Sequence, residues 1–175
     1  KESVNAISRA DLVDLMDHQY GPTNVVISVA GNVPHDEVVE ALTHHVEIWK
    51  PQDSRPWIPA RLGQEKAAIR VEYRKSEQAH ICVSLPGLHL NHEDRYAMNL
   101  MNIILGEGMS SRLFLEVREK KGLAYDVHSS VSQFHDCGSL IVYCGSEPSR
   151  SPQALDAIMG QLSALREGFS KHEVE

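Results

Sequence analysis

Arg118 and Tyr125 are the side chains whose types and spacing best fit the binding of a polar substrate. They stand seven positions apart in the run Arg-Glu-Lys-Lys-Gly-Leu-Ala-Tyr at residues 118–125. A guanidinium can donate hydrogen bonds to a carbonyl oxygen, and a phenol adds a further donor. The spacing alone leaves this interpretation and that of a solvated run of charges equally open.

A turn with two glycines precedes this run, in the sequence Gly-Glu-Gly-Met-Ser-Ser at residues 106–111. Such a turn before a capped helix can present free backbone N–H groups to an anion. No Lys-Ser/Thr pair follows at the spacing of a phosphate-binding loop. The favoured interpretation is a tight turn between two helices with a capping serine, and no nucleotide cofactor is expected.

Ten histidines raise the question of a metal site. A zinc site needs three or four converging ligands, and a helical pair of ligands stands four positions apart. His44 and His45 are adjacent, so they point about 100° apart on a helix. His128 and His135 fall on opposite faces of a strand. The sequence therefore predicts no metal bound by this chain.

Composition excludes several classes of protein. With 17 Lys and Arg against 24 Asp and Glu, the formal charge is −7, and no basic patch offers a nucleic-acid surface. The longest apolar run, residues 25–30, is far shorter than the roughly 20 residues that span a bilayer. We expect no nucleic-acid partner and no membrane contact. The chain has three cysteines, Cys82, Cys137 and Cys144, which we interpret as small buried residues. Their small number and the lack of a signal peptide favour a cytoplasmic location.

The first part of the chain, residues 1–50, predicts a helix, a strand and a second helix. Ser8 and Asp11 form a capping box, and apolar residues then recur at helical spacing as far as Tyr20. Residues 24–30 are rich in Val and Ile, as in a strand covered on both faces. Pro34 suits the first position of the next helix. Prolines and scattered charges then predict a linker over residues 51–64.

Residues 65–175 predict a second domain of the α+β class. Apolar and polar residues alternate over 69–74, 79–85, 124–135 and 139–145, which predicts a four-stranded antiparallel sheet whose last two strands form a hairpin. Helices are expected over 91–106, from Ser110 or Ser111 to Gly122, and from Ser151 to Phe169. Together these elements predict a two-layer sandwich of an antiparallel sheet covered by helices. A capping box of Ser170 and Glu173 marks a further helix start, so we expect the chain to be a portion of a longer protein.

The segment at residues 106–125 resembles the second-domain signature of the insulinase, pitrilysin and mitochondrial processing peptidase family of zinc metallopeptidases. It reads Gly-Glu-Gly-Met-Ser-Ser-Arg-Leu-Phe-Leu-Glu-Val-Arg-Glu-Lys-Lys-Gly-Leu-Ala-Tyr. Residues 8–33 are similar to the stretch that closes the first domain of that family. The resemblance implies a zinc endopeptidase of repeated two-layer domains, which close as a clamshell around an unfolded peptide.

In this family an inverted H-x-x-E-H motif supplies two zinc ligands and a general base, and the motif does not occur in these 175 residues. The resemblance therefore implies that zinc is bound by an upstream domain or a partner subunit, with a dimer in the full protein. Residues 1–50 would complete the preceding domain, and this portion would be inactive alone. A non-catalytic assembly subunit of the same fold is the alternative.

The resemblance also implies roles for particular residues. In some members an arginine and a tyrosine of the second domain reach the substrate near the zinc, and their motif falls on Arg118 and Tyr125 here. These would hold the peptide backbone and stabilise charge on the scissile carbonyl. Gly108 and Ser110 lie in the turn that approaches the cleft in relatives, so they are further candidates for substrate contact.

Overall fold

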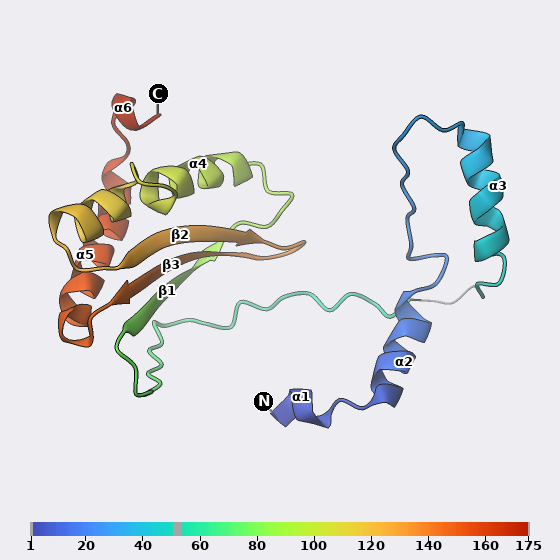
Figure 1. The fold of residues 1–175 in the computed structure, drawn as a ribbon, viewed down its shortest axis with the longest axis horizontal. Coiled ribbons are helices and arrows are strands. Elements are labelled where there is room, and N and C mark those ends of the chain that lie inside the picture. Colours follow the sequence, from blue (N-terminus) through green and yellow to red (C-terminus); the bar gives the residue numbers. More distant parts are fainter. Residues whose placement is uncertain (1, 51–53, 175) are drawn as a thin grey trace. The chain divides into compact units, whose positions relative to one another are not determined.

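The computed structural model of the protein describes residues 2–50 and 54–174. Two compact units make up the chain, Lys1–Ile58 and Pro59–Glu175 (Figure 1). Residues 51–53, the first part of the predicted linker 51–64, lie outside the described residues. The predicted domain limits at residues 50 and 65 stay a prediction.

The first unit contains three helices: α1 (Glu2–Ala6), α2 (Arg9–Gln19) and α3 (His35–Val46). The predicted capping box opens α2, because the Ser8 hydroxyl accepts from the Asp11 amide at 3.3 Å and the Asp11 carboxylate accepts from the Ser8 amide at 2.8 Å. Pro34 takes the N-cap of α3, one position earlier than predicted. Side-chain capping therefore fixes the start of α2, whereas no side-chain hydrogen bond caps α3.

The predicted strand at residues 24–30 is wrong for this structure. These residues form no ladder, and Val26 is 94% exposed. A strand needs a neighbour to accept and donate its backbone hydrogen bonds, and the described elements of this unit are helices. The apolar pattern is present, but the described residues of this unit form no strand that could pair with it.

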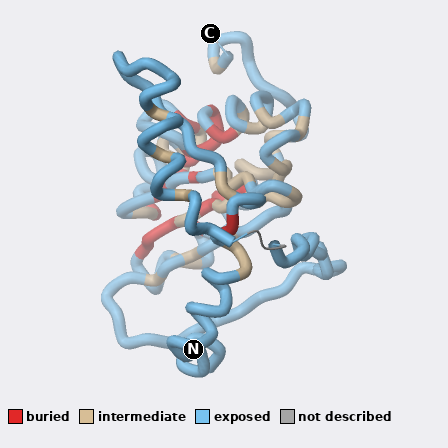
Figure 2. The backbone as a smooth tube through the Cα atoms, turned by 90° about the vertical axis from the view of Figure 1, so that its right-hand side faces the viewer, coloured by how far each residue is buried: buried red, intermediate tan, exposed pale blue. Residues whose placement is uncertain are grey.

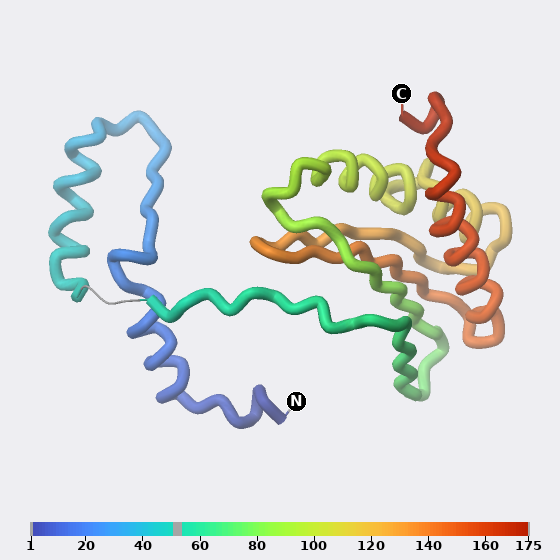
Figure 3. Tube along the Cα trace, turned by 180° about the vertical axis from the view of Figure 1, so that it is seen from behind, coloured from blue at the N-terminus to red at the C-terminus, as the bar shows by residue number. Residues whose placement is uncertain are grey.

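The second unit is built on a three-stranded antiparallel sheet in the order β1-β3-β2. Its strands are β1 (Ala79–Gly87), β2 (Asp126–Gln133) and β3 (Gly138–Ser146), and the predicted hairpin joins β2 to β3. Helices pack on the sheet (Figures 1 and 3), so the predicted α+β class is confirmed. The helical elements of this unit are, in chain order, α4 (Arg95–Gly106), the π-helix η1 (Phe114–Lys120), the 3-10 turn η2 (Pro148–Arg150), α5 (Ser151–Ala164), the 3-10 turn η3 (Leu165–Glu167) and α6 (Lys171–Val174). Of these, α4, η1 and α5 pack against the strands.

The predicted fourth strand, over residues 69–74, does not form. These residues stand outside the sheet, and Tyr73 is 93% exposed. Alternation indicates a segment able to pair, whereas pairing itself depends on a partner edge elsewhere in the chain. The predicted helix to Phe169 also ends early, because α5 stops at Ala164 and Gly168 takes a φ of 91°.

The core lies between one face of the sheet and the helices. Buried residues, red in Figure 2, gather there; they include Leu105, Leu113, Val117, Val142 and Ile158. Cys144 belongs to this core as predicted, and burial raises the pKa of its thiol. Cys82 is exposed, contrary to prediction, because it alternates with the inward residues of β1. None of the helices in the described part of the chain is long and apolar enough to cross a membrane.

Gly106 at the end of α4 lies against β2, and we expect Gly106→Ala to destabilise the fold by about 1–3 kcal/mol. A Cβ there would come within 2.5 Å of the Ser129 backbone nitrogen, so the helix or the strand would have to move. Gly160→Ala in α5 is the matched control, since a Cβ there meets nothing within 4 Å and the helix gains about 0.4–1 kcal/mol. Denaturant unfolding of both variants measures the difference. Equal effects would contradict the close approach.

Candidate functional site: the turn, the π-helix and the edge of the sheet

The turn between α4 and the π-helix is held by its own side chains. The Ser111 hydroxyl donates to the Gly108 carbonyl at 2.7 Å, and Glu107 accepts from the Asn102 side chain at 3.2 Å. Gly108 has a φ of 90°, a conformation that favours glycine. Ser110, which lies between Gly108 and Ser111 in the chain, is exposed. The predicted tight turn is therefore present and helix geometry begins at Arg112. The Ser111 hydroxyl donates into the turn, whereas the predicted capping serine would accept from a helix N–H.

A groove of about 570 Å³ runs beside this turn, between α4 and β2. Its lining includes Gly108 and four consecutive residues of β2, 128–131. Side chains of consecutive strand residues point to opposite faces, so all four meet the groove along the strand's edge. β2 is an outer strand of the sheet, and an outer edge can pair with an extended peptide. Ser110, Arg118 and Tyr125 are not among the lining residues.

Arg118 lies near the end of the π-helix η1, on its exposed side. Val117 beside it is fully buried and anchors the helix in the core. The Arg118 guanidinium carbon lies 4.9 Å from the centre of the Phe114 ring, within the range of a cation–π contact. Because a π-turn inside a helix often marks a functional site, this geometry is compatible with substrate contact.

The neighbouring lysines are held differently. Lys120 and Lys121 donate to the two oxygens of Glu116 at 3.1 and 3.2 Å, and these hydrogen bonds lower the pKa of the Glu116 carboxyl. The two lysines thus share one carboxylate, whereas the Arg118 guanidinium faces an aromatic ring.

Tyr125 stands directly before β2, and its side chain is 59% exposed. Its backbone N–H donates to the Gly145 carbonyl at 2.8 Å. Gly122 takes a φ of 60°, and its N–H donates to the Arg118 carbonyl at 3.0 Å. Leu123 is buried in the core. Arg118 and Tyr125 are therefore both exposed, at the two ends of the turn formed by Gly122. Arg118 contacts the Phe114 ring, and the Tyr125 backbone is bonded to Gly145.

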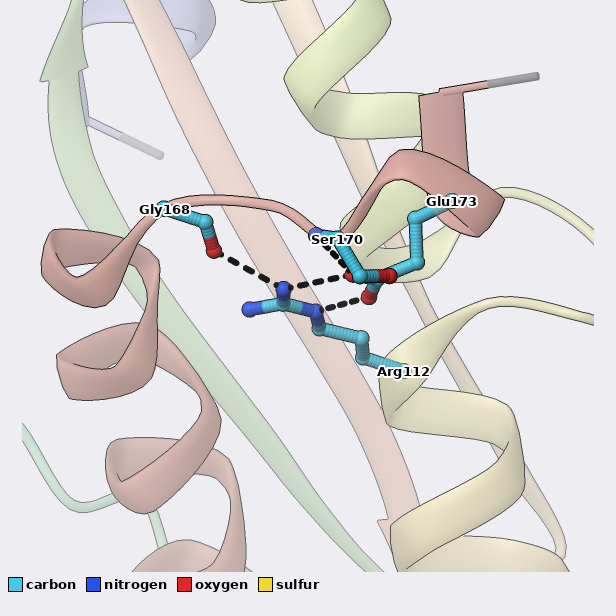
Figure 4. Close-up of polar contacts among 4 residues, drawn as sticks. All are labelled: Arg112, Gly168, Ser170 and Glu173. Carbon is cyan, nitrogen blue, oxygen red and sulfur yellow. Dashed lines mark hydrogen bonds and ion pairs between the residues drawn. The ribbon is translucent and has the colours of Figure 1, made fainter.

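Arg112 is the residue that sequence reasoning missed. Its guanidinium donates from Nε and Nη2 to the two oxygens of the Glu173 carboxylate (Figure 4). Nη2 also donates to the Gly168 carbonyl at 3.0 Å. Glu173 accepts in addition from the Ser170 amide and hydroxyl at 2.8 and 2.7 Å. This ion pair ties the segment after α5 to the end of the glycine turn. The local sequence indicated the capping box of Ser170 and Glu173. It gave no sign that Glu173 would pair with Arg112, 61 positions earlier in the chain.

The Arg112–Glu173 pair makes a pH-dependent contribution to stability. Hydrogen bonds from Arg112 and Ser170 lower the pKa of Glu173 to about 2 from its usual 4.5. Stabilisation from the ionised carboxylate is therefore complete above about pH 4.5 and is lost as the pH falls toward 2. We expect the Tm difference between the native protein and Glu173→Gln to shrink over that range. Glu119→Gln, at an exposed site, is the control, and a difference that stays constant down to pH 2 would refute the pairing.

The described residues do not fit a catalytic zinc. Within residues 2–50 and 54–174, no group of three or more His, Cys, Asp or Glu side chains converges to hold a metal ion. His80 and His128 both lie beside Tyr143, with the His80 Nδ1 at 2.8 Å from the phenol oxygen. These imidazoles therefore belong to a row of rings across the sheet.

Comparison with known proteins places this arrangement in context. Over 99% of its length the chain is 41% identical to an uncharacterized zinc protease of Streptomyces coelicolor, and over its full length 36% identical to the uncharacterized zinc protease YmxG of Bacillus subtilis. The chain spans 39% and 42% of the length of these two relatives.

Solved structures share the fold. A peptidase M16 inactive domain from Pseudomonas fluorescens matches 98% of the chain and 42% of its own, with a TM-score of 0.85 and 27% identity. A protease from Helicobacter pylori matches 98% of the chain and 43% of its own, with a TM-score of 0.83 and 22% identity. The family described as the peptidase M16 inactive domain matches residues 6–175. The chain therefore belongs to the peptidase M16 inactive domain family.

Proposed function

We propose that this chain is the substrate-binding, non-zinc portion of a zinc-dependent endopeptidase. The observation that carries the proposal is the match of residues 6–175 to the M16 inactive domain. Relatives named zinc proteases are more than twice as long as this chain, which leaves room for a catalytic domain beside the inactive one. The activity therefore belongs to the complete protein.

Zinc in this proposal is held outside the chain, by an upstream domain or a partner subunit that carries the H-x-x-E-H motif. When bound there, zinc would polarise the scissile carbonyl and activate water. The chain itself lacks the motif, and its described residues form no ligand cluster. Its own contribution is to bind and orient the peptide.

Arg118 and Tyr125 are the proposed contacts to the peptide near the scissile bond. Both are exposed, and both are fixed by the backbone hydrogen bonds of the Gly122 turn. The guanidinium and the phenol would donate to peptide carbonyls, and preorganised donors of this kind stabilise developing negative charge. Gly108, through the groove that it lines, and the exposed Ser110 would contact the peptide further along.

The partners in this proposal are an unfolded peptide and the zinc-bearing half of the clamshell. The free edge of β2 suits an unfolded substrate, because strand addition requires an extended backbone with unpaired N–H and C=O groups. A dimer of the full protein in the cytoplasm completes the proposal.

The complete protein provides the test. We expect it to bind one zinc ion per H-x-x-E-H motif and to cleave an unstructured peptide, with cleavage lost on treatment with a chelator and restored by zinc. The reading frame upstream of Lys1 shows whether the motif is on the same chain. A complete protein with no such motif, no partner that supplies it and no cleavage would favour the non-catalytic assembly subunit.

A further inference from the structure

We propose that Arg150 is a positioning residue that holds the Gly122 turn, and with it Arg118 and Tyr125, in the geometry that contacts the peptide. This inference rests on the proposed function. Arg150 lies in none of the motifs that point to the family, and its role follows from contacts of the connection between β3 and α5.

The end of β3 and the connection that follows it each contact the Gly122–Tyr125 segment at one point. The Arg150 guanidinium donates from Nη1 to the Gly122 carbonyl at 2.7 Å. Three residues along, the Tyr125 amide donates to the Gly145 carbonyl at 2.8 Å. The two hydrogen bonds bracket the segment that separates the Arg118 helix from the Tyr125 side chain.

The connection itself is rigid enough to act as a support. The Arg150 amide donates to the Glu147 carbonyl at 2.9 Å, and the Ser151 hydroxyl donates to the same carbonyl at 3.2 Å. Ser146 is fully buried, and its hydroxyl lies 3.2 Å from that of Ser151. Arg150 therefore projects from a short 3-10 turn that is fixed at both ends.

Gly122 is the point at which such support matters most. With a φ of 60° the peptide turns sharply there, and glycine leaves many other conformations open. A charge-assisted hydrogen bond to its carbonyl selects one of them. The Tyr125–Gly145 hydrogen bond joins backbone atoms, so a side-chain substitution does not remove it. The Arg150–Gly122 hydrogen bond is made by a side chain, so Arg150→Ala removes it.

The first measurement is amide hydrogen exchange in the complete protein. Arg150→Ala should speed exchange in the peptides that cover residues 122–127, whereas Arg166→Ala, at another exposed arginine of the same unit, should not. Arg150→Lys keeps a charged donor and should restore most of the protection. Unchanged exchange in Arg150→Ala would overturn the inference, whatever the activity shows.

The second measurement is kcat/KM for an unstructured peptide. A net loss of about 1 kcal/mol, typical of one hydrogen bond, corresponds to a loss of about fivefold. We expect that loss for Arg150→Ala in the native background, and less than about twofold in the Arg118→Ala/Tyr125→Phe background. An equal loss in both backgrounds would show that Arg150 contacts the peptide itself and would overturn the positioning role.

The two proposals can fail separately. If Arg118→Ala and Tyr125→Phe leave kcat/KM unchanged, the proposed peptide contacts are wrong, while hydrogen exchange still decides whether Arg150 holds the turn. If those variants lose activity and Arg150→Ala does not, the peptide contacts stand and the positioning role is refuted.

Discussion

Replacing Arg118 by alanine in the complete protein is expected to lower kcat/KM for peptide hydrolysis about a hundredfold. Arg118 is exposed and its guanidinium lies over the Phe114 ring, and its charged N–H groups can donate strong hydrogen bonds to a carbonyl. A donor whose bond strengthens as charge develops would lower kcat when lost, whereas one that only binds the ground state would raise KM. Steady-state kinetics with an unstructured peptide separates the two.

Tyr125→Phe should lower kcat/KM by about tenfold, because it removes one neutral donor and keeps the ring. The matched controls are Arg166→Ala and Tyr96→Phe, both at exposed positions of the same unit, and each should stay within about twofold of the native protein. Unchanged kcat/KM in both Arg118→Ala and Tyr125→Phe would refute the proposed contacts.

Leu113→Ala is expected to destabilise the protein by about 2–5 kcal/mol. Leu113 is 0% exposed and lies in the core cluster, next to the turn that leads into the π-helix. Removing its side chain leaves a cavity between that helix and the sheet, and the lost transfer free energy adds to the cost of the cavity. Denaturant unfolding of the complete protein measures the change.

Leu115→Ala tests whether burial is the cause. Leu115 stands two positions further along the same helix but is 43% exposed, so we expect its truncation to cost less than about 1 kcal/mol. Equal losses for the two leucines would mean that helix propensity, and not core packing, governs the stability of this segment.

The sequence predicted what depends on neighbouring residues. The capping box of Ser8 and Asp11 and the hairpin between β2 and β3 are both present, because caps and turns depend on a few consecutive residues. α4 begins at Arg95, four residues after the predicted start at Asn91, so the predicted start of this helix is wrong.

The errors lie where distant segments decide the structure. Apolar residues cluster over residues 24–30 and alternate with polar ones over 69–74, yet neither segment forms a strand. Such a pattern indicates that a segment is able to pair, but it does not show that a partner strand is present. The Arg112–Glu173 ion pair and the Arg150–Gly122 hydrogen bond join residues 61 and 28 positions apart. No local pattern indicates such contacts.

The sequence predicted the part of the candidate site that lies in one continuous segment, and missed the part that a distant segment completes. Residues 106–125 form one continuous motif, so resemblance alone pointed to Gly108, Ser110, Arg118 and Tyr125. The groove beside Gly108 also needs β2, which arrives later in the chain and lies beside α4 through the contact of Gly106 with Ser129. The edge of the sheet was therefore visible only in the folded chain.

Photo-cross-linking from position 125 is the most direct test of the claim that this portion contacts the peptide. With p-benzoylphenylalanine in place of Tyr125 in the complete protein, irradiation should attach a labelled peptide substrate, and excess unlabelled peptide should abolish the product. The same replacement at Tyr96, on the exposed side of α4, should give little. Equal products at both positions, or none at 125 while the protein still cleaves the peptide, would contradict the account.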